Sequence, residues 1–509
     1  MIPLSRSFRA GAMSILLLVS LNQTSTAQVI SIKTVPVASG DQFVIVPSKN
    51  LGMGGVSIAL DDPLLDPFVN PAKGRKVEGT RLFGGSSFYA ISEDNGSGRT
   101  LPMAVLTGSG RWFGGAAGAI QQLIPASPNF SRPWFGPIDP FPQSPYRGQL
   151  PLNRYGSGML GTVLPGGRVA IGAGISASDL EAVDGVELLY ANSLEIVQYG
   201  NTVDYRLGIS GDLDGDRTFE ILLLHNRVNM THDVTYLDGA GSTTGTPVIP
   251  PFGPFPYPTT IKRNHDKSST TGLHLGYVQP MKQEGWRVGG IVTGNWKSHP
   301  KIPEYELENM VPIPRDPGNS WAYNLGIGFS RVGATSLFGI DLIFEPIWTE
   351  TWGEAAEPTT TAGGVLIPIG GKTVENDFRF DNYVISLGTA WEHGSVEYQL
   401  GLNLRSVNYR LNQINNVEGF RRIQREHWIE WTPSWGANLK FPEFQLHYVG
   451  RFRAGTGRPG AATDRVFDRQ LYIIPASSGD FLVAPTGSLV LQEAVVVTHQ
   501  FFMVVPLRF

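Results

Sequence analysis

The 509-residue sequence predicts an all-β fold, a transmembrane antiparallel β-barrel of about 14–16 strands. Three observations predict it. Apolar and polar residues alternate along many segments, the connections between these segments alternate between short and long, and the chain stops on an aromatic residue, Phe509, at the end of such a segment. Because successive side chains of a strand point to opposite faces, each of these segments would have one apolar and one polar face.

The last strand-sized segment, Glu493–Phe509, shows the pattern most clearly. One parity is apolar and is interrupted only by His499; its members are Val495, Val497, Phe501, Met503, Val505, Leu507 and Phe509. The other parity mixes polar residues with Val496, Phe502 and Val504. A strand that ends the chain on an aromatic is typical of bacterial outer-membrane barrels. Phe509 is therefore predicted to be the signal that the barrel-assembly machinery reads.

The other end of the chain predicts export. Residues 1–27 have the form of a signal peptide, with Arg6 and Arg9 before an apolar stretch and Ser25–Ala27 as a small-residue cleavage site, so the mature chain would begin at Gln28. The apolar stretch is too short to cross a bilayer as a helix. No later segment approaches the required length. These features predict the outer membrane of a Gram-negative bacterium as the location.

Composition narrows the class of partner. The formal charge of −4 becomes −6 when Arg6 and Arg9 leave with the signal peptide, which argues against nucleic acid. Charged residues make up 17%, below the roughly 25% usual in soluble proteins. The chain has no cysteine, which excludes a lipoprotein and a disulfide-stapled domain. No cofactor is expected.

The connections predict how the barrel lies in the membrane. Short links are expected at Ser109–Gly110, Pro165–Gly167, Asp212–Asp216, Lys282–Gly285, Gly333–Ala334, His393–Gly394 and Lys440–Pro442. Longer connections are expected at residues 92–100, 123–153, 178–198, 229–268, 298–318, 349–377, 409–425 and 455–492. Barrels of this class have short periplasmic turns and longer extracellular loops. The count is sixteen strands, or fourteen if the terminal hairpins do not form.

Two long connections are rich in proline and aromatic residues, Pro125–Pro151 and Pro247–Pro258. They could be a landing area for hydrophobic solutes, or a folded cap that packs its aromatic rings over the barrel mouth. The acidic run Asp212–Asp216 is predicted to be a polar turn, because it lacks the glycine and glutamate spacing of a calcium-binding EF-hand loop.

The segment before the first strand carries a motif. Leu51–Asp62 reads LGMGGVSIALDD, and Phe68–Ala72 reads FVNPA. This pattern resembles the N-terminal signature of the FadL-like outer-membrane transport family: a glycine-rich stretch, a short apolar run with acidic residues, and Asn-Pro-Ala just before the first strand. The segments Asp341–Trp352 and Trp431–Gly436 resemble strands of that family more weakly.

The resemblance implies a division of the mature chain into residues 28–79, an N-terminal extension and hatch inside the lumen, and residues 80–509, the barrel with its long extracellular loops. The hatch motif would comprise Gly52, Gly54, Gly55, Asn70, Pro71 and Ala72. Glycine allows close backbone approach or positive φ, Asn70 can bond local backbone, and Pro71 fixes φ. These residues would shape the hatch, with no catalytic role.

The resemblance also implies a function: uptake of hydrophobic compounds, such as long-chain fatty acids or aromatic hydrocarbons, by a monomer whose other partner is outer-membrane lipid. The solute would bind beneath the extracellular loops and pass around the hatch. The sequence differs from the family at Lys73–Lys76, where small or apolar residues are usual, and in its strand count. A secretion-associated barrel of the type IX kind, a scaffolding barrel and a general porin therefore stay open as alternatives.

Charged residues fall on the polar parity of many strands. They are Asp204, Arg206, Arg287, Asp341, Glu345, Glu397, Arg405, Glu443 and Arg451. Their mixed signs favour ion-paired packing between the barrel wall and the hatch, with a polar solute pathway as the alternative. The nine histidines show no H-E-x-x-H spacing, and no G-x-S-x-G or phosphate-binding loop is present. The sequence thus predicts no metal site and no enzyme activity.

Overall fold

The computed structural model describes residues 40, 42–92, 96–124, 150–183, 195–237, 259–299, 318–355, 358–459 and 491–507. The signal peptide, Phe509 and nearly all of the two proline-aromatic connections lie outside the described residues. Among the described residues, no helix is long and apolar enough to cross a membrane.

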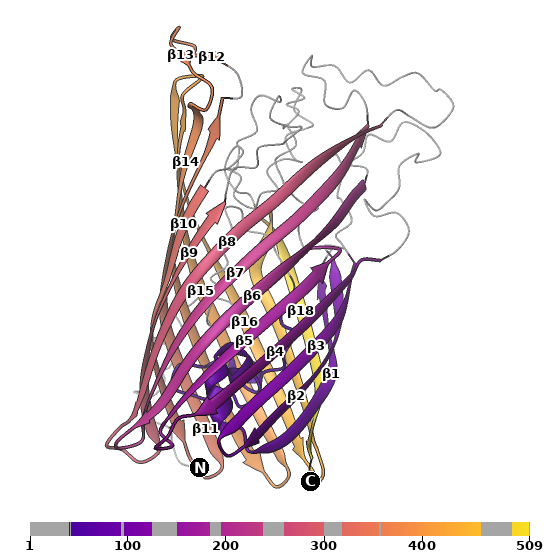
Figure 1. Ribbon diagram of the computed structural model, residues 1–509, viewed down its shortest axis with the longest axis vertical. Helices are drawn as coiled ribbons and strands as arrows, with labels where there is room; N and C mark the ends of the chain where they lie inside the picture. The colour runs from indigo at the N-terminus through magenta and orange to yellow at the C-terminus, as the bar shows by residue number, and fades with distance from the viewer. Residues whose placement is uncertain are drawn as a thin grey trace, which may run out of the picture.

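Within these ranges, sixteen strands form one closed antiparallel barrel, which confirms the predicted fold class (Figure 1). The strands are β1 (Gly79–Ile91), β2 (Ser97–Ser109), β3 (Trp112–Ile124), β4 (Leu152–Val163), β5 (Val169–Leu180), β6 (Glu195–Leu213), β7 (Arg217–Leu237), β8 (Thr259–Pro280), β9 (Trp286–His299), β10 (Gly318–Val332), β11 (Ser336–Glu354), β14 (Lys372–His393), β15 (Val396–Asn415), β16 (Phe420–Lys440), β17 (Gln445–Pro459) and β18 (Leu491–Leu507). Strand β1 pairs with β18 and closes the sheet. Closure leaves no unpaired strand edge for lipid to meet.

The outer face of the barrel carries a broad apolar band. Its exposed members come from every side of the wall and include Leu101, Met103, Ile120, Leu160, Ile175, Leu207, Leu223, Val292, Leu325, Leu400 and Phe501. In β18 the parity predicted to be apolar points outward, and His499 on that face bonds the Tyr448 hydroxyl at 3.0 Å. Large exposed apolar side chains around a closed barrel are the surface that a bilayer covers.

The two ends of the barrel differ as predicted. All seven short links are tight turns at one end, for example residues 110–111 between β2 and β3 and residues 394–395 between β14 and β15. In the link at Asp214–Asp216, Gly215 and Asp216 have φ of 76° and 57°, and the predicted polar turn forms. The longer connections lie at the other end.

Several of the longer connections are shorter than predicted, because the strands run further than expected. Residues 409–425 contain a turn of four residues, Asn416–Gly419, between β15 and β16. Strands β14, β15 and β16 have 22, 20 and 21 residues, whereas about 9–11 residues cross a bilayer. Part of the 349–377 connection is also ordered, with β12 (Thr359–Thr360) pairing with β13 (Leu366–Ile367) beyond the barrel mouth (Figure 1).

Residues 42–78, called here the N-terminal segment, lie inside the barrel (Figure 1). They contain η2 (Leu51–Met53), the one-turn helix α2 (Asp66–Val69) and η3 (Pro71–Lys76). Their apolar side chains share a core with inward-facing residues of the wall; this core includes Val46, Leu64, Phe68, Phe83, Leu106, Phe113, Met159, Phe502 and Val504. This contact explains why the inner parity of β18 is partly apolar.

Candidate functional site

Glycines of the barrel wall make room for the N-terminal segment. A Cβ built at Gly339 of β11 would lie 2.5 Å from Cγ1 of Val56, and one at Gly328 of β10 would lie 2.6 Å from Cβ of Ile58. Gly388 and Gly401, on β14 and β15, face the backbone of residues 53–54 at still closer range. Real Cβ atoms do not approach this closely, so the wall accepts the segment only where a side chain is missing.

The glycine motif of the segment supplies conformation as well as space. Gly54 and Gly55 have φ of 70° and 74°, the positive values expected for them. The Gly54 N–H donates to Oγ of Ser434 at 2.9 Å, and that hydroxyl donates to the Gly52 carbonyl at 3.1 Å. A Cβ at Gly52 would run into the side chain of Gln399. The motif therefore fixes the segment against β15 and β16.

The Asn-Pro-Ala motif forms the start of η3. The Asn70 side chain accepts a hydrogen bond from the Ala72 N–H at 3.2 Å and donates to Oε2 of Glu220 at 3.0 Å. Pro71 is the first residue of η3, a position where its missing N–H costs nothing. Ala72 is fully buried, and the Asn70 side chain fills the space that a Cβ at Gly208 would need. One asparagine thus caps a helix and ties it to β7.

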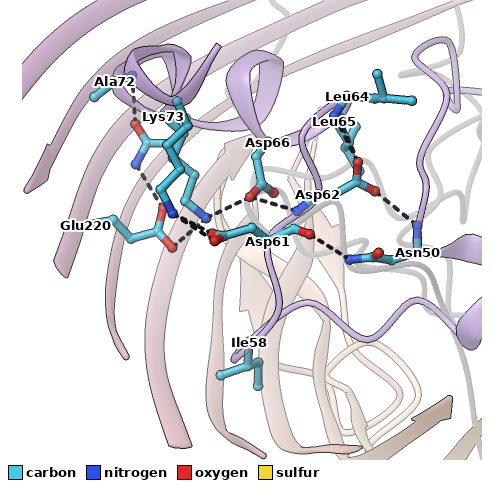
Figure 2. A network of polar contacts seen from close by, with 12 residues as sticks. Asn50, Ile58, Asp61, Asp62, Leu64, Leu65, Asp66, Ala72, Lys73 and Glu220 are labelled. Atoms are coloured by element: carbon cyan, nitrogen blue, oxygen red, sulfur yellow. Dashed lines mark hydrogen bonds and ion pairs between the residues drawn. The ribbon is translucent and has the colours of Figure 1, made fainter. Parts of the chain in front are cut away.

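A buried cluster of charges lies where η3 meets the wall (Figure 2). Nζ of Lys73 is 3.0 Å from Glu220 on β7 and 3.3 Å from Asp66 on α2. Nε2 of His274, on β8, is 3.8 Å from the same Glu220 carboxylate. Lys73 thus joins the N-terminal segment to β7, and Glu220 extends the cluster to β8.

Charges around Asp66 are unbalanced. Burial raises the pKa of Asp66 to about 7, and the neighbouring carboxyl groups of Asp61, Asp62 and Glu220 raise it as well, because they oppose a further negative charge there. Lys73 acts in the opposite direction and lowers this pKa, but by less. Carboxylates on both sides of Lys73 raise the pKa of that lysine despite its burial. Asp66 therefore exchanges its proton near neutral pH.

The wall also holds the backbone of the segment directly. Oδ2 of Asp341 accepts the N–H groups of Ser57 and Ile58 at 2.7 and 3.1 Å. The Ser330 hydroxyl donates to the Ala59 carbonyl at 2.7 Å, and Nη1 of Arg206 donates to the carbonyl of residue 69 at 3.0 Å. Buried backbone N–H and C=O groups need hydrogen-bond partners. These contacts supply partners for groups of the segment that are not paired within a helix or strand.

Seven of the nine predicted wall charges divide into three groups; of the other two, Arg451 is buried on β17 and Arg287 is exposed near the start of β9. Asp204, Arg206, Asp341 and Glu397 take part in holding the segment, Glu397 through an ion pair of 3.3 Å with Lys49. Glu345 and Arg405 pair with each other at 2.5 Å within the wall. The prediction was wrong for Glu443, which lies in the exposed turn between β16 and β17, because the strand ends at Lys440.

A second feature, an inward-facing apolar cluster, lies toward the long-connection end of the barrel. We call it the upper apolar cluster; its members are Ala322, Ile347, Phe378, Phe380, Val407, Tyr409, Leu411 and Trp428, from β10, β11, β14, β15 and β16. The rings of Phe380 and Tyr409 are 5.2 Å apart, and those of Tyr409 and Trp428 are 6.4 Å apart. The ion pair Glu345–Arg405, with Asn382 donating to Glu345 at 3.0 Å, borders it on the side of the segment.

The sequence analysis missed the upper apolar cluster. In this part of the wall the alternation is inverted, so that polar side chains such as Arg379 and Arg410 point outward and apolar ones point inward. The inversion was present in the sequence, as Tyr409 and Leu411 alternating with Arg410 and Asn412. It marks strand that has left the bilayer, where the outer face meets water.

A groove on the outer face lies across β8–β14 and has a volume of about 790 Å³. Its lining includes Leu275, Val292, Leu325 and Phe344, which belong to the apolar band. Because that band faces lipid, these lining residues are part of the membrane contact. Among the described residues, no group of three or more His, Asp or Glu side chains is placed to hold a metal ion.

The fold and its surfaces define the class of protein: a β-barrel of the Gram-negative outer membrane, with an even number of strands, an apolar outer band and short turns at one end. No protein-family model and no curated protein matches the chain.

Solved structures with a similar form include three transport proteins. A FadL homologue of Pseudomonas aeruginosa has 11% identity and a TM-score of 0.43, with 92% of this chain and 98% of that chain covered. The Ralstonia pickettii toluene transporter TbuX has 10% identity and a TM-score of 0.38, with 90% and 97% covered. The FrpB iron transporter of Neisseria meningitidis has 9% identity and a TM-score of 0.33, with 84% and 82% covered. Because the sequence identities and TM-scores are this low, the function has to be inferred from the residues of this chain.

Proposed function

We propose that the protein is a FadL-like outer-membrane transporter that takes up hydrophobic compounds such as long-chain fatty acids or aromatic hydrocarbons. The observation that carries the proposal is the upper apolar cluster, which faces inward above a lumen that the N-terminal segment occupies. A water-filled porin needs polar side chains at its mouth. An apolar, inward-facing surface favours a solute that leaves water on binding.

The N-terminal segment supports the same proposal as a hatch. The segment fills space that contains solvent in a porin. It packs on glycines of the wall, forms ion pairs with it, and is bonded by Asp341, Ser330 and Arg206. A solute that binds at the upper apolar cluster would therefore have to pass around the segment or move it. The polar layer of Glu345, Asn382 and Arg405 between the two would contact the head group of an amphiphile.

Binding of a fluorescent long-chain fatty acid to the detergent-purified protein tests the proposal. We expect saturable binding that unlabelled hydrocarbons compete. Phe380→Ala should weaken it roughly tenfold or more, because Phe380 is packed within the upper apolar cluster and its truncation would leave a cavity in the surface that meets the solute.

Tyr383→Ala is the matched control. Tyr383 lies on the same strand, β14, three residues away, but points outward and stacks on Phe344 at 5.0 Å. We expect it to leave binding unchanged. A folded wild-type barrel that binds no hydrophobic probe and conducts ions through a large stable pore would contradict the proposal and favour a porin. The absence of both binding and conductance, with stable capture of envelope proteins, would favour a secretion or scaffolding role.

A further inference from the structure

The outer face of the barrel carries a row of six side chains that we call the tryptophan–arginine row. It consists of Trp296, Trp321, Trp348, Arg379, Arg410 and Arg425, on β9, β10, β11, β14, β15 and β16. Each residue is the direct cross-strand partner of the next, and all six lie on the outward parity of their strands. The row lies toward the long-connection end, which is the extracellular end.

The tryptophans indicate how deep the row lies. Trp296 and Trp348 are exposed on the outer face. Tryptophan on the outer face of a membrane barrel concentrates where hydrocarbon meets head groups. Three arginines continue this row on strands β14–β16, which extend beyond the bilayer. The guanidinium groups therefore lie at or just above the head groups of the extracellular leaflet.

The three arginines differ in how far carboxylates of the protein compensate their charge. Like charges directly opposite each other on neighbouring strands destabilise a sheet, and here Arg410 has an arginine on both sides. Arg379 has one carboxylate, Asp377, at 3.6 Å. Within the described part of the chain, no carboxylate forms an ion pair with Arg410 or Arg425.

The neighbours on the same face supply negative charge at one end of the row: Asp377 and Asp381 flank Arg379 along β14. The outward positions next to Arg410 along β15 are Asn408 and Asn412, and those next to Arg425 along β16 are Ile423 and His427. All three arginines are exposed. Arg410 and Arg425 are adjacent guanidinium groups that form no ion pair with a described residue, and together they match the geometry of phosphate, which arginine binds with two parallel hydrogen bonds.

We propose that the tryptophan–arginine row is a binding site for the phosphorylated glycolipid of the extracellular leaflet, lipopolysaccharide. Phosphates of its lipid A and inner-core sugars bind Arg379, Arg410 and Arg425, while Trp348 and Trp321 contact its acyl chains and sugars at the interface. The site faces outward and is separate from the upper apolar cluster, which faces the lumen. It is therefore independent of the transported solute.

The test is binding of fluorescently labelled rough-type lipopolysaccharide to the detergent-solubilised full-length protein. The double variant Arg410→Gln/Arg425→Gln should bind roughly tenfold more weakly or worse, since it removes two charge-assisted contacts. Arg410→Lys/Arg425→Lys should keep part of the affinity, because charge remains but the two-pronged geometry is lost. Lipid A stripped of its phosphates should bind weakly to every form.

The matched control is Arg154→Gln. Arg154 is also exposed toward the long-connection end, on β4, but it pairs with Asp179 at 2.8 Å and with Glu181 at 3.4 Å. We expect this variant to bind as the wild type does. The proposal fails if the folded double variant binds lipopolysaccharide like the wild type, if Arg154→Gln weakens binding equally, or if removal of the phosphates has no effect. Fatty-acid binding should be the same in the wild type and the double variant.

Discussion

At the scale of single residues, absent side chains decide where the N-terminal segment lies. Gly339, Gly388 and Gly401 are wall positions where a Cβ would meet the segment. Asp341 and Ser330 then bond the backbone that these glycines admit. The fit depends on both features, because close approach without hydrogen bonds would leave buried backbone groups unsatisfied.

Gly388→Ala should loosen the N-terminal segment. The added Cβ would meet the backbone and Cβ of Met53, so that the segment or the strand must shift. We expect higher ion conductance in planar bilayers and faster proteolysis of the segment than in the wild type. Gly158→Ala is the control, because a Cβ at Gly158 of β4 meets nothing within 4 Å. Equal ion conductance and equal proteolysis in the two variants would show that the close contact at Gly388 does not hold the segment.

Asp66 should make stability depend on pH. Its pKa is about 7 in the folded protein against about 3.9 in an unfolded chain. Between these values the folded state binds more protons, so the free energy of unfolding falls as pH rises from about 4 to about 7 and is level above that. The fall is at most about 1.4 kcal/mol per pKa unit.

Urea unfolding of the wild type and of Asp66→Asn at pH 5, 6.5 and 8 measures this dependence. The variant should be less sensitive to pH than the wild type. Asp214→Asn, at an exposed aspartate of the β6–β7 turn, should leave the dependence intact. Parallel pH profiles for the wild type and Asp66→Asn would mean that Asp66 is ionised throughout this range.

At the scale of elements, strands β14–β16 combine two environments in one continuous ladder. Their lower parts turn apolar side chains such as Tyr383 and Leu400 to lipid, and their upper parts turn apolar side chains such as Phe378 and Leu411 inward. Pairing is unbroken from Val396 to Asn415 between β15 and β16. The same backbone geometry thus builds a membrane wall below and one side of the upper apolar cluster above.

Cysteine labelling in intact cells tests this division. The chain has no cysteine, so each introduced thiol reports alone. Ile414→Cys and Leu400→Cys lie on the same strand, the same outward parity and similarly apolar positions, 36% and 51% exposed. A membrane-impermeant maleimide should label residue 414 and leave residue 400 unlabelled. Labelling at neither position would place the upper part of β15 within the bilayer.

At the scale of the whole molecule, the barrel is filled and not hollow near its short-turn end. The core that joins Val46, Leu64 and Phe68 to Phe83, Phe113 and Phe502 packs the segment against one side of the wall, strands β18 and β1–β5, while η2 contacts β14–β17. The charged cluster at Lys73 lies beside this core. The segment therefore supplies part of the packing inside the barrel.

Deletion of residues 28–77 should produce a barrel that conducts ions well and unfolds at a lower temperature. Conductance should rise because the lumen loses its filling, and stability should fall because Phe83, Phe113 and Phe502 lose their packing partners. Single-channel recording and thermal unfolding of the refolded protein measure the two effects. A folded deletion variant that conducts as little as the full chain would show that the segment does not close the lumen.

The sequence by itself determined the barrel and its turns and limited the strand count to 14–16, because these follow from a period-two pattern and from glycine, proline and aspartate at the links. It also singled out the local roles of Gly54, Gly55 and Asn70, which depend only on backbone conformation and near neighbours.

Only the tertiary structure decided what the inner parity contacts. Some contacts join the segment to the wall, as between Met53 and Gly388 or between Lys73 and Glu220. Others join different strands, as between Phe380 and Tyr409. The same holds for the tryptophan–arginine row, whose members are separated along the chain and meet through strand register. Period two tells which face a side chain takes, whereas closure and register determine its neighbours.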